Sequence, residues 1–315
     1  MLATAEKMAQ AGAVNTPNVP REAVLIVNAH SRRGEALFRE ARDKLEQAGI
    51  RITAAHALDN PDDLIPTVAA AVKGGAPMVI VGGGDGSLSS AVDEMVGNSC
   101  VFALLPLGTA NSFARTLGIP LDLDGAIATI ANGRRRRIDL GVINGDYFAN
   151  AAAMGISPMI GETVPHKLKR YLGRLGYLIW AVRCAVQFRP FKLIVDDGTQ
   201  KHTLWATEVR IANGRFHGGV ELIEDSSPDD GDIVVQAVTG KNVSRLAWDW
   251  FARFFRLRNR DLVTQEFRGQ RFQLETRPSQ KISIDGEVLT RTPALVENAH
   301  KAIEVVVPLK GEEVS

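Results

Sequence analysis

Short apolar runs that alternate with helical patterns constrain the fold of this chain more than any other feature of its sequence. Strand-like runs occupy residues 23–27, 50–57, 78–81 and 100–105. Helical patterns occupy residues 35–48, about 62–72 and the stretch that ends at Met95. Continuous apolar runs such as Ala23–Val27 are typical of parallel strands that are buried on both faces. Strands that alternate with helices at this spacing predict a doubly wound α/β domain.

The pattern changes after about residue 138, where short strands are joined by turns. The expected strands are residues 138–143, 147–153, 192–195, 204–212, 233–238, 272–275, 282–284 and 303–307. Turn pairs such as Asn144-Gly145 and Asp285-Gly286 separate them. This half of the chain is therefore expected to be β-rich, a sandwich or barrel with a few inserted helices. The fold class is α/β + β, a doubly wound N-terminal domain followed by a β-rich, sandwich-like domain.

The length of 315 residues suits two domains at roughly 150 residues each. We expect a flexible tail at residues 1–20, the α/β domain at 21–138 and the β-rich domain at 139–300. Residues 301–315 are expected to form a C-terminal strand and tail, and this strand can return to the N-terminal domain.

Charge, hydropathy and cysteine content exclude several classes of protein. The 37 basic and 36 acidic side chains leave a net charge of +1, which gives no reason to expect nucleic acid as a partner. The longest uncharged stretch, Met95–Ala114, contains Pro106 and several polar residues and is too broken to cross a bilayer. Two cysteines make neither a disulfide framework nor a zinc site, and Met1–Pro20 lacks the apolar segment of a secretory signal. The expected compartment is the reducing cytoplasm.

A glycine-rich loop, Gly82-Gly-Gly-Asp-Gly-Ser87, carries the strongest chemical signal. It lies between a buried strand and a helix. Glycine permits positive φ and lets a ligand approach the backbone closely, and successive N–H groups can bind phosphate. Asp85 would repel a bare phosphate, but it suits a Mg²⁺ ion between carboxylate and nucleotide. The alternative is a glycine-rich turn whose Asp85 caps the following helix.

Two further polar loops follow strands of the same domain. One is Asn28–Gly34 and the other runs from Pro106 to Arg115. Ligands bind outside the carboxyl ends of the strands in an open α/β sheet. Three polar loops on this edge therefore predict a nucleotide-binding domain more strongly than any one of them does alone.

Several motifs together resemble those of the diacylglycerol kinase catalytic-domain family, which includes soluble bacterial diacylglycerol kinases and is related to sphingosine and ceramide kinases. The motifs are Gly83-Gly-Asp-Gly-Ser87, Pro106-x-Gly-Thr-x-Asn-x-Phe-x-Arg115, Asp139-Leu-Gly141, Asp230-Gly231 and Asp285-Gly-Glu287. The resemblance covers about residues 21–310. The Gly-Gly-Asp-Gly core is shared with NAD kinases, whereas the second and last motifs are specific to the lipid kinases.

The resemblance implies roles for particular residues. Glu287 matches the proton acceptor that deprotonates the lipid hydroxyl, and Asp85 acts beside it through Mg²⁺. The implied ATP-binding residues are Asn28, Ser31, Gly83, Gly84, Gly86, Ser87, Gly108, Thr109 and Asn111. A structural Mg²⁺ is implied at the Asp230 side chain and the backbone carbonyls of Ser227 and Asp232.

The chain departs from the family pattern at several positions. Asn28 is followed by alanine where proline is usual, Leu58 lies near a position of a nucleotide-contacting threonine, and Ser89-Ser90 replace the common Asn-Glu. From the residues alone, Glu287 can also be a solvated acid in a hairpin turn. Asp230 can likewise be a plain turn residue.

Two segments have the composition of basic amphipathic helices. Residues 165–192 carry seven basic side chains and no acid, with apolar residues at helical spacing, and residues 245–258 are rich in Trp and Phe. Such helices suit the surface of anionic membranes. Alternatively, both apolar faces pack on the β-rich domain.

The resemblance therefore implies an ATP-dependent lipid kinase that uses Mg²⁺, with diacylglycerol as the first acceptor and phosphatidic acid as the product. A sphingoid base or ceramide stays open as the acceptor. The rival functions are a soluble-metabolite kinase of the NAD-kinase type and a non-catalytic lipid-binding protein. The expected partners are ATP and a lipid at a membrane surface. Peripheral contact with the inner face of the membrane and a homodimer are left open.

Overall fold

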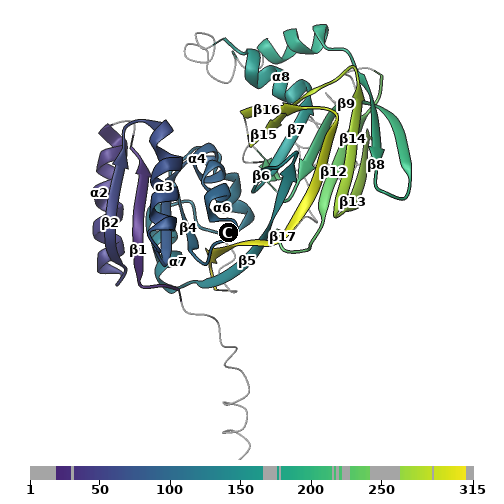
Figure 1. Ribbon diagram of the computed structural model, residues 1–315. Helices are drawn as coiled ribbons and strands as arrows, with labels where there is room; N and C mark the ends of the chain where they lie inside the picture. Colours follow the sequence, from purple (N-terminus) through teal and green to yellow (C-terminus); the bar gives the residue numbers. More distant parts are fainter. Residues whose placement is uncertain are drawn as a thin grey trace, which may run out of the picture.

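A parallel sheet with helices on both faces forms the N-terminal half of the molecule (Figure 1). The computed structural model describes residues 19–29, 32–165, 176, 179–214, 216–217, 220–221, 228–241, 263–285 and 287–309. Strands lie in the order β2 (Arg51–Leu58), β1 (Glu22–Asn28), β3 (Met78–Gly83) and β4 (Val101–Pro106), all parallel. The helices are α2 (Arg32–Gln47), η1 (Pro61–Asp63), α3 (Leu64–Lys73), α4 (Asp85–Ser90), α5 (Val92–Met95), α6 (Ser112–Thr116) and α7 (Leu123–Asn132).

The strand order explains why helices cover both faces. The chain moves outward from β1 to β2 and then crosses back over β1 to β3. Right-handed crossovers in opposite directions place their helices on opposite faces of a sheet. Accordingly, α2 contacts α7, whereas α3 contacts α5.

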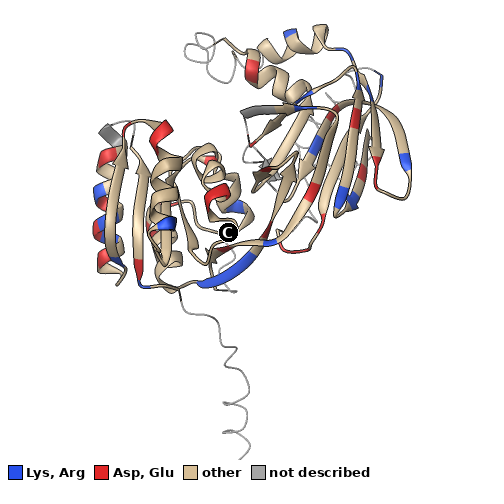
Figure 2. Ribbon diagram, viewed as in Figure 1, with Lys and Arg blue, Asp and Glu red and all other residues tan. Residues whose placement is uncertain are grey.

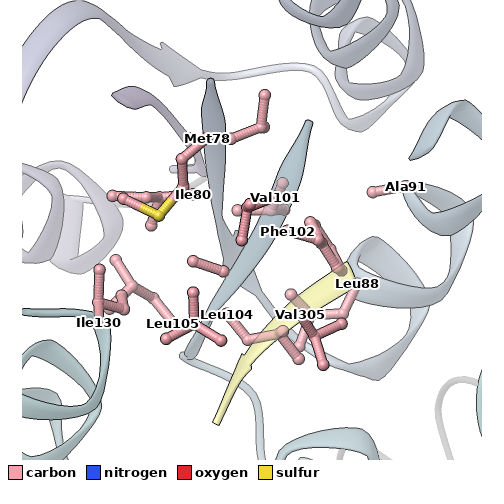
Figure 3. Close-up of a cluster of buried hydrophobic side chains, with 14 of the residues drawn as sticks. Met78, Ile80, Leu88, Ala91, Val101, Phe102, Leu104, Leu105, Ile130 and Val305 are labelled. Atoms are coloured by element: carbon pink, nitrogen blue, oxygen red, sulfur yellow. The ribbon is translucent and has the colours of Figure 1, made fainter. Parts of the chain in front are cut away.

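The core of this half fixes the loops at the edge of the sheet (Figure 3). Phe102 and Leu105 of β4 are fully buried, and Leu88 of α4 is buried in the same cluster. Alternate residues of a strand point to opposite faces, so β4 packs on helices from both sides. Burial of a Leu or Phe side chain contributes roughly 1.5–3 kcal/mol. Through Leu88, the short helix after the glycine-rich loop is held firmly against the sheet.

Two long strands connect the halves. Strand β17 (Ala294–Val307) pairs antiparallel with β5 (Arg134–Ile143) and, near its end, parallel with β4. Val305 of β17 belongs to the same buried cluster as the N-terminal strands. On the edge of β17 that faces away from β5, the first residues of the strand, from Ala294 to Glu297, pair with β14 (Arg271–Arg277) of the C-terminal half. A single sheet of fifteen strands therefore runs through the part of the chain that the structure describes.

The C-terminal half is built from antiparallel strands (Figure 1). Its remaining elements are β6 (Asp146–Phe148), β7 (Ala151–Gly155), α8 (Ile156–Thr163), β8 (Phe191–Asp196), β9 (Lys201–Ala212), β10 (Phe216–His217), β11 (Val220–Glu221), β12 (Ile233–Thr239), β13 (Thr264–Gly269), β15 (Lys281–Ile284) and β16 (Glu287–Arg291). Buried and exposed positions alternate in β8 and β14, as expected for strands with one face in a core. That core contains Phe148, Phe191, Phe272 and other apolar side chains.

The predicted α/β + β fold class is confirmed, but some strands differ from the prediction. The strand expected at 147–153 is broken, because backbone groups of Ala149 and Asn150 bond to other segments and leave the strand ladder. β17 begins at Ala294, nine residues before the predicted strand, and β10, β11, β13 and β16 were not predicted. The division expected between residues 138 and 139 stays a prediction, and it falls within the continuous strand β5.

Candidate active site

Three loops meet at the carboxyl edge of the parallel sheet. β1 ends at Asn28, whose amide Nδ2 donates to the hydroxyl of Ser87 at 3.3 Å. The loop after β4 reaches the glycine-rich loop, because Leu107 N donates to Gly83 O at 2.9 Å. Most of the predicted ATP-binding residues that the structure describes are thus brought together. Gly86 and Thr109 are exposed to solvent.

Close packing explains the glycines better than backbone conformation does. Gly84 has φ −86°, and Gly82, Gly83 and Gly86 also avoid the left-handed region, so the positive φ that glycine permits is not used in this loop. A Cβ on Gly108 would lie 2.6 Å from Cα of Gly84 and 2.8 Å from Oδ1 of Asn111. Two backbones pass each other at a distance that only glycine allows.

Asn111 holds the loop after β4 in shape. It is buried and has a positive φ of 47°, a conformation that asparagine tolerates better than most residues. Its Oδ1 accepts a hydrogen bond from Gly108 N at 2.9 Å, and its Nδ2 donates to Gly108 O at 3.0 Å. This predicted ATP-binding residue therefore acts first on its own loop.

Asp85 joins two helices at this edge. It is the first residue of α4, and its Oδ1 accepts a hydrogen bond from Phe113 N of α6 at 3.1 Å. No side chain caps α4 itself, so the alternative that Asp85 caps the helix following its own loop is wrong. The carboxylate instead stands between the two loops that the sequence assigns to phosphate.

We predict that Gly108→Ala lowers the free energy of unfolding by about 2 kcal/mol, because overpacking of a tight contact typically costs about 1–3 kcal/mol. ATP affinity should fall at least tenfold, since both loops must separate. Denaturant unfolding and ATP titration measure the two effects.

The matched control is Gly161→Ala. Gly161 is exposed in α8, and a Cβ there would meet no heavy atom within 4 Å. This variant should be as stable as the wild type or slightly more stable. Wild-type stability and ATP affinity in Gly108→Ala would contradict the account of the loop contact.

A turn from the C-terminal half reaches the same edge. Asp285, which follows β15, accepts a hydrogen bond from the Ser89 hydroxyl of α4. It also accepts hydrogen bonds from Ala149 N at 3.3 Å and Ala151 N at 3.2 Å. In the sequence, Asp285 is conspicuous only as part of the motif Asp285-Gly-Glu287, and Ser89 only as a departure from the family pattern.

A cavity of about 200 Å³ opens between the two halves. Its lining includes Gly86, Asp93, Asp146 and Asp285, and none of its described lining residues is Lys or Arg; acidic residues are red and basic residues blue in Figure 2. Loss of hydration raises the pKa of Asp285 to about 6, and the nearby charge of Asp85 adds to the rise. Loss of hydration, followed by the charge of Asp146, likewise raises the pKa of Asp93 to about 6. This excess of negative charge fits a divalent cation.

Stability should depend on pH through Asp285. Its folded pKa of about 6 exceeds the ordinary value of 3.8, so its contribution is complete below about pH 4 and is lost as the pH rises through 6. We expect the unfolding free energy of the wild type, relative to Asp285→Asn, to fall by roughly 2 kcal/mol between pH 4 and pH 7. Denaturant unfolding at both pH values tests this, and an unchanged difference would contradict it.

The turn predicted to bind structural Mg²⁺ is attached to β5 by a buried carboxylate. Asp139 is fully buried, and its Oδ2 accepts a hydrogen bond from Gly231 N at 2.8 Å. Its Oδ1 accepts from Lys301 N at 2.7 Å and lies 2.9 Å from Nδ1 of His300. Within the turn, Asp230 accepts from Asp232 N at 3.0 Å. The sequence signal for this buried role was the position of Asp139, an acidic residue between the apolar residues Ile138 and Leu140 of a strand.

Some predicted residues lie outside the described part of the chain. These are Ser31, Ser227 and the side chain of Glu287. The backbone of Glu287 begins β16, paired with Ile284 across the turn. Among the described residues, no cluster of three or more His, Cys, Asp and Glu side chains is arranged to hold a metal. The structural Mg²⁺ site stays a prediction.

Comparison with known proteins gives the family to which this two-part fold belongs. Residues 22–143 match the family described as "Diacylglycerol kinase catalytic domain". Residues 150–307 match the "YegS C-terminal NAD kinase beta sandwich-like domain". The chain belongs to the diacylglycerol kinase catalytic-domain family and is a lipid kinase, a class that uses ATP as phosphoryl donor.

Individual relatives cover nearly the whole chain. A diacylglycerol kinase of Bacillus subtilis is 29% identical over 313 residues, which cover 93% of this chain and 98% of that protein. One of Staphylococcus saprophyticus is 26% identical over 309 residues, with the same coverage of 93% and 98%. The crystal structure of a Bacillus anthracis diacylglycerol kinase superposes with a TM-score of 0.72 at 19% identity and covers 91% of this chain and 97% of that one. The last comparison supports the fold alone.

Proposed function

We propose that this protein transfers the γ-phosphoryl group of Mg·ATP to a lipid hydroxyl, with diacylglycerol as the acceptor and phosphatidic acid as the product. One observation carries the proposal. The loop that bears Asp85 and the turn that leads to Glu287 come from different halves and meet at one cavity through Ser89 and Asp285. The names of the full-length relatives support diacylglycerol as the acceptor.

The three loops of the parallel sheet would bind the nucleotide. Backbone N–H groups of Gly84 and Gly86 and the hydroxyls of Ser87 and Thr109 suit phosphate oxygens. Asp85 would hold Mg²⁺, which when bound offsets the charge of the nucleotide phosphates. Asn28 orients Ser87 through the hydrogen bond described above.

In the proposed reaction, the Glu287 carboxylate accepts the proton of the lipid hydroxyl. The hydroxyl oxygen then forms a bond to the γ-phosphorus, while the bond from that phosphorus to the β–γ bridging oxygen breaks. The products are the lipid phosphate and ADP. Positioned proton transfer typically contributes about 10²–10⁴-fold to the rate, and loop N–H groups would stabilise charge on the transferring group.

We also propose that the turn at residues 227–232 binds a structural Mg²⁺ through the Asp230 carboxylate and the carbonyls of Ser227 and Asp232. Oxygen ligands suit this ion. The attachment of the turn to Asp139 would keep these ligands in place.

A helical segment at residues 179–187 presents apolar side chains to solvent beside α8, at the top of Figure 1. Ala181 and Cys184 pack against Ile156 and Ile160 of α8. On the other face, Ile179, Val182 and Val186 are 52%, 59% and 81% exposed. Arg183 lies 5.5 Å from the ring of Trp180. The predicted apolar face is therefore exposed here, although the segment packs on the protein through a second face.

We propose that this exposed face rests on an anionic membrane at its inner, cytoplasmic surface. Apolar side chains flanked by arginine suit the boundary between headgroups and acyl chains. None of the described helices is long and apolar enough to pass through a bilayer. The second predicted amphipathic segment, residues 245–258, lies outside the described residues.

Replacing Ile179, Val182 and Val186 together by serine should weaken binding to vesicles of phosphatidylglycerol and phosphatidylcholine by roughly 10–100-fold, since each side chain loses part of its burial free energy. Vesicle sedimentation measures the binding. Leu309→Ser, which removes a 54% exposed apolar side chain elsewhere, is the control. Equal binding by all three proteins would exclude this face as the contact.

The proposed reaction is tested by incubating the protein with γ-labelled Mg·ATP and micelles that contain diacylglycerol, a sphingoid base or ceramide. Label in phosphatidic acid is the expected result. Label in another lipid phosphate would correct the acceptor. If no lipid is labelled but NAD is phosphorylated, the lipid proposal is wrong and the NAD-kinase alternative holds. Gel filtration of the same sample decides whether the chain forms a homodimer.

A further inference from the structure

The carboxylate of Asp285 accepts three hydrogen bonds from two distant segments. Ser89 donates from α4 of the N-terminal half, while Ala149 N and Ala151 N donate from the β6–β7 connection. Both carboxylate oxygens are used, one of them twice. An asparagine amide could not accept all three bonds, because its NH₂ group only donates. An amide in place of this carboxyl group would therefore lose at least one of the three bonds.

The backbone at Asp285 is also constrained. Asp285 has a positive φ of 45°, and its N–H donates to Ala151 O at 3.1 Å. On the other side, Ile284 pairs with Ala152 of β7. The backbone of Asp285 thus attaches the turn to β7, and its carboxylate attaches the turn to α4.

Helix α4 carries both Ser89, which donates to Asp285, and Asp85. Ser89 follows Asp85 by four residues in α4, so both side chains lie on one face, about one turn or 5.4 Å apart. Asp85 is itself attached to α6 through Phe113 N. The Ser89–Asp285 hydrogen bond therefore sets the distance between the Asp85 carboxylate and the turn.

Glu287 begins β16 immediately after this turn. β16 pairs with β15 and stands at the end of the strand order. An edge strand has a partner on one side only. The position of Glu287 is therefore determined mainly by the turn and by the hydrogen bonds that Asp285 makes to α4 and to residues 149 and 151.

We infer that Ser89 and Asp285 are a pair of positioning residues: their hydrogen bond across the cleft holds the Glu287 turn at a fixed distance from Asp85 during phosphoryl transfer. The inference rests on the proposed function, because Glu287 and Asp85 have their roles there. Neither Ser89 nor Asp285 touches the reacting atoms in this account. They act through the backbone that carries Glu287.

Ser89→Ala tests the pair, because Ser89 is buried and alanine removes little besides the hydroxyl. We expect kcat for lipid phosphorylation to fall about 10–100-fold, as a displacement near 1 Å can cause. The dissociation constant of ATP should change less than twofold, since the Ser89 hydroxyl donates to Asp285 and not to a group assigned to the nucleotide. Ser89→Thr, which keeps the hydroxyl donor, should restore most of kcat.

The matched control is Thr129→Val. It removes a buried helix hydroxyl that donates to Gly125 O at 2.9 Å in α7, away from the cleft. Any loss of activity that follows from weaker folding alone should appear here too. A drop of kcat in Ser89→Ala that equals the drop in Thr129→Val would overturn the inference.

A double-mutant cycle of Ser89→Ala and Asp285→Asn, measured as unfolding free energies, gives the coupling between the two side chains without any lipid. Coupling between the two positions supports it, and additive effects overturn it. If the wild type labels a lipid and Ser89→Ala keeps wild-type kcat, the inference fails alone. If the wild type labels no lipid, the proposed function fails and the positioning role falls with it, even where the cycle shows coupling.

Discussion

Asp85→Asn should reduce kcat for lipid phosphorylation by more than about 10³-fold, because the charge that would hold Mg²⁺ at the phosphates is lost. Asparagine keeps an oxygen that can accept the hydrogen bond from Phe113 N. The two helices should therefore stay together, and the unfolding free energy should change by less than about 1 kcal/mol. Transfer of labelled phosphate and denaturant unfolding measure the two quantities.

Glu94→Gln is the matched control for this variant. Glu94 lies in α5, nine residues from Asp85, and its loss removes the same charge from the same region. The control should retain wild-type activity. A similar loss in both variants would show that general electrostatics, and not the place of Asp85 between the loops, determines the rate. An active Asp85→Asn would remove Asp85 from the proposed chemistry.

Glu287→Gln should lower kcat by about 10²–10⁴-fold, the usual contribution of a positioned proton acceptor. Glutamine has a similar shape but cannot accept the proton. ATP affinity should be unchanged, because the nucleotide loops belong to the other half of the molecule. Single-turnover transfer of labelled phosphate, with calorimetric ATP titration beside it, separates the chemical step from binding.

Glu297→Gln provides the comparison for that experiment. Glu297 is an exposed carboxylate of β17 whose described partner is Arg271, at 3.5 Å. Its replacement should leave kcat within twofold of the wild type. If Glu287→Gln is equally active, then Glu287 is a solvated turn residue, as its sequence context alone permits. If ATP no longer binds to Glu287→Gln, the division of roles between the halves is wrong.

The N-terminal half was the more predictable part of the fold. Its strands are continuous apolar runs, and β3 and β4 are buried at every position. Strands with one solvated face carry weaker signals, and β13 was missed because its residues are mostly polar or charged. The early residues of β17 were missed for a related reason. Several of them are half-buried, because they pair along a surface before the strand enters the core.

The site was predictable where its residues are close in sequence. The glycine-rich loop and the segment that contains Asn111 were found as motifs, although the reason for their glycines was only partly foreseen. Ser89 and Asp285 are 196 positions apart, and no local pattern relates two such residues. The buried role of Asp139 depends in the same way on segments that approach only in the folded chain.

Strand β17 has a consequence for how the protein is made. The ribosome synthesises β4 long before β17, yet β4 needs Glu304 and Val305 as its parallel neighbours. Until they emerge, the nascent N-terminal half has an open strand edge, a surface prone to faulty pairing. Its native sheet is therefore completed only after nearly all of the chain has been translated. A premature stop codon between β16 and β17 would damage both halves at once, so neither half is an independent module for gene fusion.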